Sequence, residues 1–171
     1  THPSSELTNR VDRFIALIRG AQAHDGYLYT YNQLHFPGER WANLQIEHEL
    51  YCHGHLIEAG VSHYQATGQR TLLAAAQRAA DLLVRDFAGA APERTPGHEE
   101  IESALIRLAR VTGNEQYLAL ARQFVEERGR STAGRFVFVE HVAAPVGSRQ
   151  RRVQRLVRPL WKRIGDGCEP D

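Results

Sequence analysis

Methionine is absent from the sequence, and cysteine occurs only twice among its 171 residues. Two cysteines, Cys52 and Cys168, cannot build a disulfide framework and have no metal-binding spacing of their own, so we expect free thiols. No run of about 18 apolar residues occurs, and the opening residues THPSSELTNR lack a signal-peptide pattern. We therefore expect a soluble, cytoplasmic protein. Because a chain without methionine has no initiator, we also expect a processed start or a piece of something longer.

Net charge is low as well, at +1, so bulk charge gives no reason to expect a nucleic-acid partner. The charge is divided unevenly at Gly129. Residues 1–129 hold 12 Lys and Arg against 16 Asp and Glu, a balance of −4, whereas residues 130–171 hold 9 against 4, a balance of +5. With 42% hydrophobic and 24% charged residues, the composition is that of one globular domain and excludes general disorder.

Apolar residues in the first 129 positions recur at the spacing of amphipathic helices, which predicts an all-α fold. Ser4 or Ser5 is the expected cap of the first helix. Residues 27–44 are rich in aromatics and broken by Pro37 and Gly38, which predicts an ordered loop with extended pieces. The five expected helices cover residues 7–18, 45–66, 70–87, 98–111 and 115–128.

Two Thr-Gly junctions, Thr67-Gly68 and Thr112-Gly113, lie 45 residues apart and reveal a weak internal repeat. The repeat unit is an antiparallel helix hairpin. Arrays of such hairpins normally need three or more copies to close a core, so we expect a segment of a larger helical ring or solenoid. A shift of 45 superposes three pairs that we expect to face neighbouring helices: Leu73 with Leu118, Ala76 with Ala121, and Ala66 with Val111.

The second expected helix, residues 45–66, has one polar face. At about 100° per residue, its histidines, tyrosine and cysteine gather on one side and its apolar residues on the other. The polar side is either the lining of a cavity for a polar ligand or a set of ordinary half-buried residues. A metal site is the weaker interpretation, because no acidic or cysteine partner stands at zinc spacing. The polar side holds His48, Tyr51, Cys52, His55 and Ala59; the apolar side holds Ile46, Leu50, Ile57, Val61 and Tyr64.

A second histidine stands at the start of the fourth helix, in PGHEEIE at 96–102. Its acidic residues suit the positive end of the helix dipole, so capping explains them without a function. His98 fits that explanation less well and suggests a contact. Glu58 and Glu102 are either catalytic carboxylates or exposed helix residues, and the second is the commoner case. The aromatics of 27–44 either stack on sugar rings or fill the core.

Four strings together resemble the catalytic domain of glycoside hydrolase family 127, the β-L-arabinofuranosidase-like group. They run in order across nearly all of residues 1–129. HELYC-x-GH-x-IEA and GHEEIE are the long motifs among them. The strings are DGYLYTY at 25–31, PGERWANL at 37–44, HELYCHGHLIEAGVSHYQATG at 48–68 and PGHEEIESALIRLARVTGNEQYLALARQFVEERG at 96–129.

This resemblance implies part of an (α/α)6 barrel, or α/α toroid, whose inner helix ends surround a sugar site. It implies an L-arabinofuranoside or a related sugar as the substrate, bound by His98 and His48, with Tyr51 and His55 as lesser candidates. The family's cysteine nucleophile, its zinc ligands and its glutamate acid/base lie beyond the matched segment. We therefore assign no catalytic residue and no metal ligand here, and expect zinc only in the full-length enzyme.

Residues 130–171 lose both the motifs and the helical period, which predicts an irregular basic tail. The chain has 20 Arg and one Lys, which is typical of a GC-rich coding sequence. In such a sequence a shifted reading frame yields mostly Arg, Ala, Pro and Gly, so a frameshift or a truncated gene model is the favoured explanation of the tail. A basic arm and a divergent family continuation stay open. The expected function is that of a glycosidase fragment, inactive alone and prone to self-association through an incomplete barrel edge. The alternative is a non-catalytic helical-repeat binding or scaffold module, and the tail leaves a nucleic-acid binder as a third.

Overall fold

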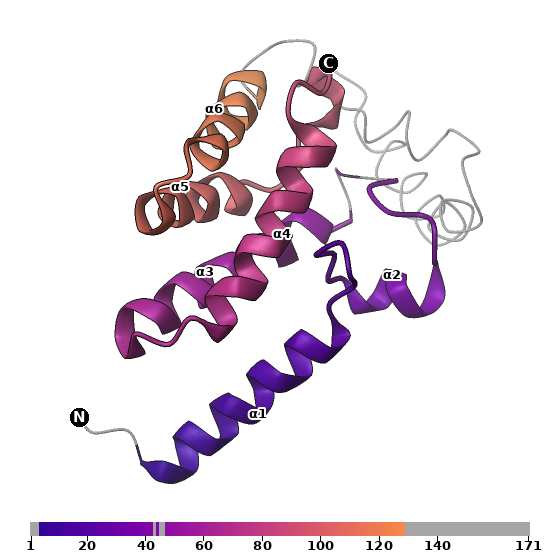
Figure 1. The fold of residues 1–171 in the computed structure, drawn as a ribbon. Coiled ribbons are helices and arrows are strands. Elements are labelled where there is room, and N and C mark those ends of the chain that lie inside the picture. The colour runs from indigo at the N-terminus through magenta and orange to yellow at the C-terminus, as the bar shows by residue number, and fades with distance from the viewer. Residues whose placement is uncertain (1–3, 43, 45–46, 129–171) are drawn as a thin grey trace, which may run out of the picture.

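The computed structural model describes residues 4–42, 44 and 47–128, and within this part the regular elements are all helical (Figure 1). The expected all-α fold is confirmed there. The basic tail, Ile46 and Cys168 lie outside the described residues. None of the described helices has the length and apolar character needed to cross a membrane. The elements are α1 (Ser5–Ala21), α2 (Thr30–His35), α3 (Glu49–Thr67), α4 (Thr71–Phe87), the short 3-10 helix η1 (Pro92–Arg94), α5 (Glu100–Thr112) and α6 (Glu115–Arg128).

Helix α1 begins where the sequence predicts. Ser4 is its cap, and the Ser4 hydroxyl accepts a hydrogen bond from the backbone N–H of Leu7 at 3.2 Å. The apolar stripe of α1 is mostly uncovered, because only Ile15 is buried while Phe14 and Leu17 are 69% and 68% exposed. In Figure 1 this helix lies along the bottom of the molecule, against α4.

The aromatic segment after α1 differs from the prediction. No strand forms among its described residues, and Thr30–His35 form the short helix α2. A side-chain hydrogen bond stabilises the start of this helix: the backbone N–H of Tyr29 donates to Gln33 Oε1 at 2.9 Å. Asn32, on the same turn, is buried against Glu49 of α3. The tertiary contact decides this local structure, and the aromatic-rich pattern alone does not reveal it.

The two predicted hairpins are present as α3–α4 and α5–α6. Gly68 and Gly113 end α3 and α5 with φ of 73° each, the left-handed conformation in which glycine is favoured. Of the superposed pairs, Ala76 and Ala121 are both fully buried, as expected. Two members of the other pairs are exposed, Leu118 at 37% and Ala66, so the prediction that all six positions face a neighbour is wrong.

Helix α3 lies between α4 and α5 and approaches both closely at glycines. A Cβ on Gly54 would lie 2.7 Å from Glu100 Cγ of α5, and a Cβ on Gly60 would lie 2.7 Å from Ala76 Cβ of α4. Glycine costs helix stability, about 1 kcal/mol relative to alanine. The close packing of three helices offsets that cost and fixes the relative positions of the starts of α3 and α5.

Candidate functional site

The four predicted site residues lie together in a cluster of rings at the starts of α3 and α5. The His48 and His98 rings are stacked with centroids 4.7 Å apart and an interplanar angle of 27°. Tyr51 lies 5.5 Å from His98 and 4.4 Å from His55, centroid to centroid. All four side chains belong to exposed residues. We call His48, Tyr51, His55 and His98 the ring cluster.

Backbone geometry explains how residues 50 positions apart meet. His48 is the N-cap of α3, and His98 immediately precedes Glu99, the N-cap of α5. Gly54 lets the start of α5 approach α3, and there His55 Nδ1 lies 3.3 Å from Glu100 Oε1. The periodicity of α3 is also confirmed, because Cys52 and Ala59 are exposed beside the cluster.

Glu49, the residue after His48, is fully buried, and sequence reasoning missed it. Its carboxylate accepts hydrogen bonds from the Tyr27 hydroxyl, from Asn32 Nδ2 at 2.8 Å and from the Trp41 backbone N–H at 2.9 Å. A buried carboxylate is tolerated only when its oxygens are satisfied in this way. Burial, together with the bond to Glu49, raises the pKa of Tyr27, so its hydroxyl stays a donor at neutral pH. No signal in the sequence marks Glu49 as buried, because it resembles an ordinary acidic residue in the first turn of a helix.

His53 is a second buried polar residue that sequence reasoning missed. Its Nε2 accepts the Leu28 backbone N–H at 3.2 Å, so its Nδ1 carries the proton and donates to the Glu49 carbonyl oxygen at 2.7 Å. Burial lowers the pKa of His53 to about 4. The neutral ring therefore ties the aromatic segment to α3 across the physiological pH range.

The aromatic segment contributes mainly to this buried network. Tyr27 is fully buried, Trp41 is 9% exposed, and the two rings meet edge to face at 5.2 Å. Tyr31, in contrast, is 49% exposed. Core filling thus explains the inner aromatics of the segment.

The two carboxylates singled out in the sequence each contact an arginine. Arg107 Nη1 donates to Glu58, and Arg128 Nη2 donates to Glu102 at 2.5 Å. The Glu58 side chain is 26% exposed and that of Glu102 is 7% exposed. Ion pairing therefore explains both residues without a catalytic role.

Metal-ligand chemistry fits the described residues poorly. Within residues 4–42, 44 and 47–128, no group of three or more His, Cys, Asp or Glu side chains could hold a metal ion. Partial burial and the charge of Glu49 raise the pKa of the Cys52 thiol, which disfavours the thiolate that binds metals.

Comparison with known proteins decides the family. Residues 1–159 match the family model described as β-L-arabinofuranosidase, GH127 catalytic domain. The chain belongs to this family. A crystal structure of a GH127 β-L-arabinofuranosidase from Geobacillus stearothermophilus T6 superposes with a TM-score of 0.73 and 42% identity, covering 84% of this chain and 22% of that one. The predicted resemblance and the partial (α/α)6-barrel fold are thereby confirmed.

Two curated relatives cover different shares of this GH127 chain. The non-reducing end β-L-arabinofuranosidase of Bifidobacterium longum subsp. longum is 38% identical over 138 residues, which are 75% of this chain and 20% of that protein. The thiol S-methyltransferase TMT1B of Rattus norvegicus is 45% identical over 42 residues, which are 25% of this chain and 17% of that protein. The chain thus spans about a fifth of the length of the β-L-arabinofuranosidases it matches.

Proposed function

We propose that this chain carries part of the sugar-binding surface of a β-L-arabinofuranosidase, with His48 and His98 as the main contacts and Tyr51 and His55 beside them. One observation supports it most: two helix starts far apart in the sequence bring these four rings into one exposed cluster. Imidazole nitrogens can donate to or accept from sugar hydroxyls, and aromatic faces can stack on the ring's C–H groups. The ligand would be an L-arabinofuranoside or a related sugar.

The test is a titration of the full chain with methyl β-L-arabinofuranoside, followed by the NMR signals of the histidine rings. We expect the His48 and His98 signals to shift with sugar concentration. His48→Ala and His98→Ala should each weaken binding by about fivefold, because each removes a hydrogen bond worth about 1 kcal/mol. His24→Ala is the matched control, since His24 is exposed and outside the ring cluster. Equal affinity in all three variants would refute the assignment.

We further propose that the chain alone does not hydrolyse arabinosides. The chain spans about a fifth of the length of its relatives. Glu58 and Glu102 are each paired with an arginine. The expected result is binding of the arabinoside without release of arabinose. Release of arabinose by the purified chain, lost in Glu58→Gln or Glu102→Gln, would overturn this proposal.

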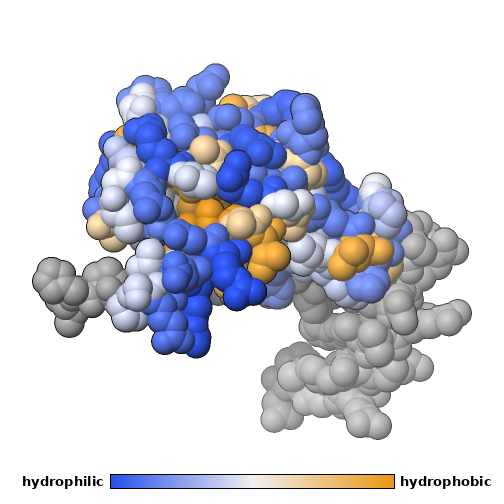
Figure 2. Space-filling model, turned by 60° about the horizontal axis from the view of Figure 1, so that its bottom comes forward, coloured by the Kyte–Doolittle hydropathy of each residue, from blue (hydrophilic) through white to orange (hydrophobic). Residues whose placement is uncertain are grey.

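The exposed stripe of α1 supports self-association through an uncovered edge of the barrel segment. Phe14, Leu17 and Leu7 are 69%, 68% and 54% exposed, and Figure 2 shows apolar surface open to solvent on the side where α1 lies. A finished scaffold module would cover such a face, so the alternative function is disfavoured. Light scattering should show association that Phe14→Gln with Leu17→Gln reduces, and that Leu34→Gln on α2 leaves unchanged. A monomer at every concentration would contradict the proposal.

We propose that the barrel segment ends at Gly129 and that residues 130–171 have another origin. The tail is 42 residues long and carries a charge balance of +5, against −4 for residues 1–129. The family match to residue 159 is the observation that opposes the boundary.

Sequencing the coding DNA beyond codon 129 tests this boundary. We expect no GH127 sequence in the other two reading frames directly after that codon. Finding the family's glutamate and paired cysteines in either frame would overturn the proposal and restore the frameshift.

A further inference from the structure

Arg128, at the end of α6, reaches across to the loop that carries His98. Its Nη1 donates to the carbonyl oxygens of Pro96 at 2.8 Å and Gly97 at 3.4 Å. Its Nη2 donates to the carbonyl oxygen of His98 at 3.2 Å and to Glu102 Oε1 at 2.5 Å. A guanidinium group suits this task because its planar fork holds several donors in fixed directions. One side chain thus contacts three consecutive carbonyls before α5 and a carboxylate in its first turn.

The partner carboxylate makes this contact costly to lose. Glu102 is only 5% exposed as a residue, and the Arg128 side chain is 26% exposed. Among the described residues Glu102 Oε2 has no hydrogen-bond partner, so the pair with Arg128 is the compensation for burying the charge. Arg128 is therefore held in place by Glu102 while its remaining donors hold the loop.

The start of α5 depends on this contact because its own cap is weak. Glu99 occupies the N-cap position without a side-chain cap hydrogen bond. A backbone bond from the Gly97 N–H to the Leu44 carbonyl oxygen at 2.9 Å tethers the loop on its other side. Arg128 and Leu44 thus hold residues 96–98 between them, directly before the ring that stacks on His48.

We infer that Arg128, with Glu102, is a positioning pair that sets where His98 lies relative to His48. Neither residue need touch the sugar. The inference rests on the proposed function for its effect on binding, whereas its effect on the ring stack stands independently. Loss of the guanidinium fork should release the loop and change the spacing of the two rings.

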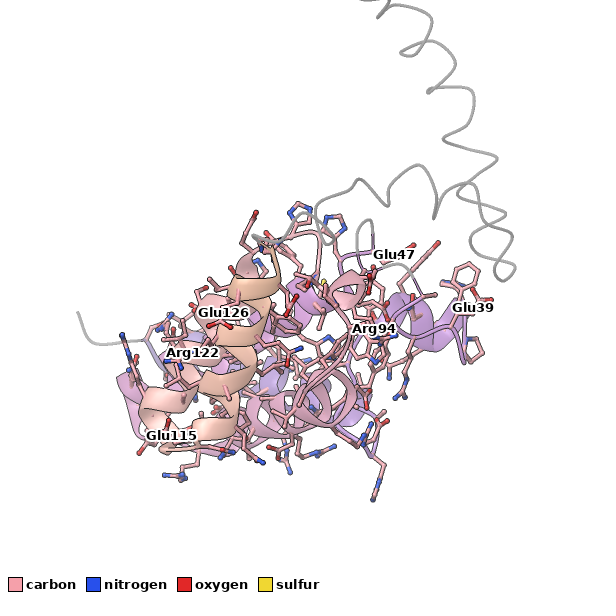
Figure 3. All side chains as sticks on the ribbon, turned by 90° about the horizontal axis from the view of Figure 1, so that it is seen from above. Glu39, Glu47, Arg94, Glu115, Arg122 and Glu126 are labelled. Atoms are coloured by element: carbon pink, nitrogen blue, oxygen red, sulfur yellow. The ribbon has the colours of Figure 1, made fainter. Side chains whose placement is uncertain are left out.

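The chain provides a matched control on the same helix. Figure 3 labels Arg122 and Glu126 along α6, and both are exposed there. Arg122→Gln removes an arginine of α6 without touching the loop before α5. Arg122→Gln with Glu126→Gln is the corresponding control for the double variant Glu102→Gln with Arg128→Gln.

The variants are Arg128→Gln, Arg128→Lys and the double variant Glu102→Gln with Arg128→Gln, all in the full chain. Arg128→Gln leaves the Glu102 charge buried and can unfold the helix pair. The double variant removes the Arg128 guanidinium and the Glu102 charge together, so no unpaired charge stays buried and the protein can fold for the test. Circular dichroism confirms the fold before any comparison. Arg128→Lys keeps the charge but loses the fork, and should restore stability more than it restores ring geometry.

The first readout is the ring-proton NMR signals of His48 and His98, which report the stack directly. We expect both signals to move in the double variant and in Arg128→Lys, and to stay in place in Arg122→Gln. Binding of methyl β-L-arabinofuranoside should weaken by about tenfold in the same variants, since small displacements of contact groups are costly. Unmoved ring signals in a folded double variant would overturn the inference.

The two proposals fail in distinguishable ways. If the ring signals move as expected but the unmodified chain binds no arabinoside, the positioning pair stands and the sugar-binding function is wrong. If the unmodified chain binds the sugar and the double variant binds it equally well with unmoved rings, the sugar-binding function stands and the positioning role is wrong.

Discussion

Helix α1 and the four-helix block α3–α6 are both amphipathic, yet only the block covers most of its apolar residues. Helix α4 buries nine residues, whereas α1, of the same length, buries only Ile15. Both helices were predicted from the same kind of periodicity. The difference teaches that a periodic sequence predicts a helix and its apolar face, but the partner that covers the face is a property of the rest of the protein.

The ring cluster belongs to the block and depends on its close packing. Its four residues come from α3 and from the loop before α5, and both are fixed by neighbours within the block. Helix α1 contributes nothing to it among the contacts of the described residues. Perturbations of the block should therefore change both stability and site, whereas perturbations of α1 should leave the site unchanged.

The largest expected effect is a core truncation in the block. Leu105 of α5 is fully buried, so Leu105→Ala should lower the free energy of unfolding by about 3 kcal/mol through lost burial and a residual cavity. Leu17→Ala in α1 should change it by less than about 0.5 kcal/mol, because that side chain is 68% exposed. Urea unfolding followed by circular dichroism measures both. Equal losses would show that α1 is covered in solution.

Protonation of His53 at low pH should lower the free energy of unfolding of the α3–α6 block. The unfolded chain takes up this proton near pH 6.5, whereas the folded chain takes it up only at about pH 4. Acid therefore favours unfolding, and stability falls as pH decreases from 6.5 to 4. The full loss would be about 3 kcal/mol for such a shift, with no contribution from His53 above this window. Urea unfolding at a series of pH values measures this slope.

Two variants, His53→Leu and His24→Ala, distinguish the contribution of His53 to acid sensitivity from that of the exposed histidines. His53→Leu should be destabilised at neutral pH, because the Leu28 N–H loses its acceptor, but should lose much of the slope between pH 6.5 and 4. His24→Ala should keep the slope. Helix α1 contains no histidine, so the effect reports on the block. An unchanged slope in His53→Leu would show that another group carries the acid sensitivity.

Sequence patterns predicted the five long helices and the shared face of His48, Tyr51 and His55, because both depend on local spacing. Gly68 and Gly113 marked the ends of α3 and α5, and the angular positions of His48, Tyr51 and His55 placed them on one exposed face. The family motifs added His98, which periodicity alone could not bring next to His48.

The buried polar network could not be predicted in the same way. Glu49 looks like a solvent-exposed helix residue until Tyr27, Asn32 and Trp41 are known to surround it. Arg128 similarly looks like a surface residue at a helix end. Such roles depend on donors from segments distant in the sequence, and no local periodicity encodes that arrangement.

The smallest effects come from two glycines, one in each region, and they should have opposite signs. A Cβ on Gly20 of α1 meets nothing within 4 Å, so Gly20→Ala should stabilise the protein by about 0.5–1 kcal/mol. A Cβ on Gly54 of α3 would lie 3.3 Å from the backbone of Glu100 and Ile101 as well as 2.7 Å from Glu100 Cγ. The flexible side chain can move aside, but the backbone can yield only if α5 shifts.

Gly54→Ala should therefore destabilise the protein by about 1 kcal/mol, since overpacking outweighs the gain in helix propensity. It should also displace the His98 ring signals, which Gly20→Ala should leave unchanged. Thermal melting and histidine NMR on the two variants measure both differences. If Gly54→Ala stabilised the chain as Gly20→Ala does, α5 would have to be free to move away from α3. The stack of His48 on His98 could then not be maintained by helix packing, and the positioning would fall to Arg128 alone.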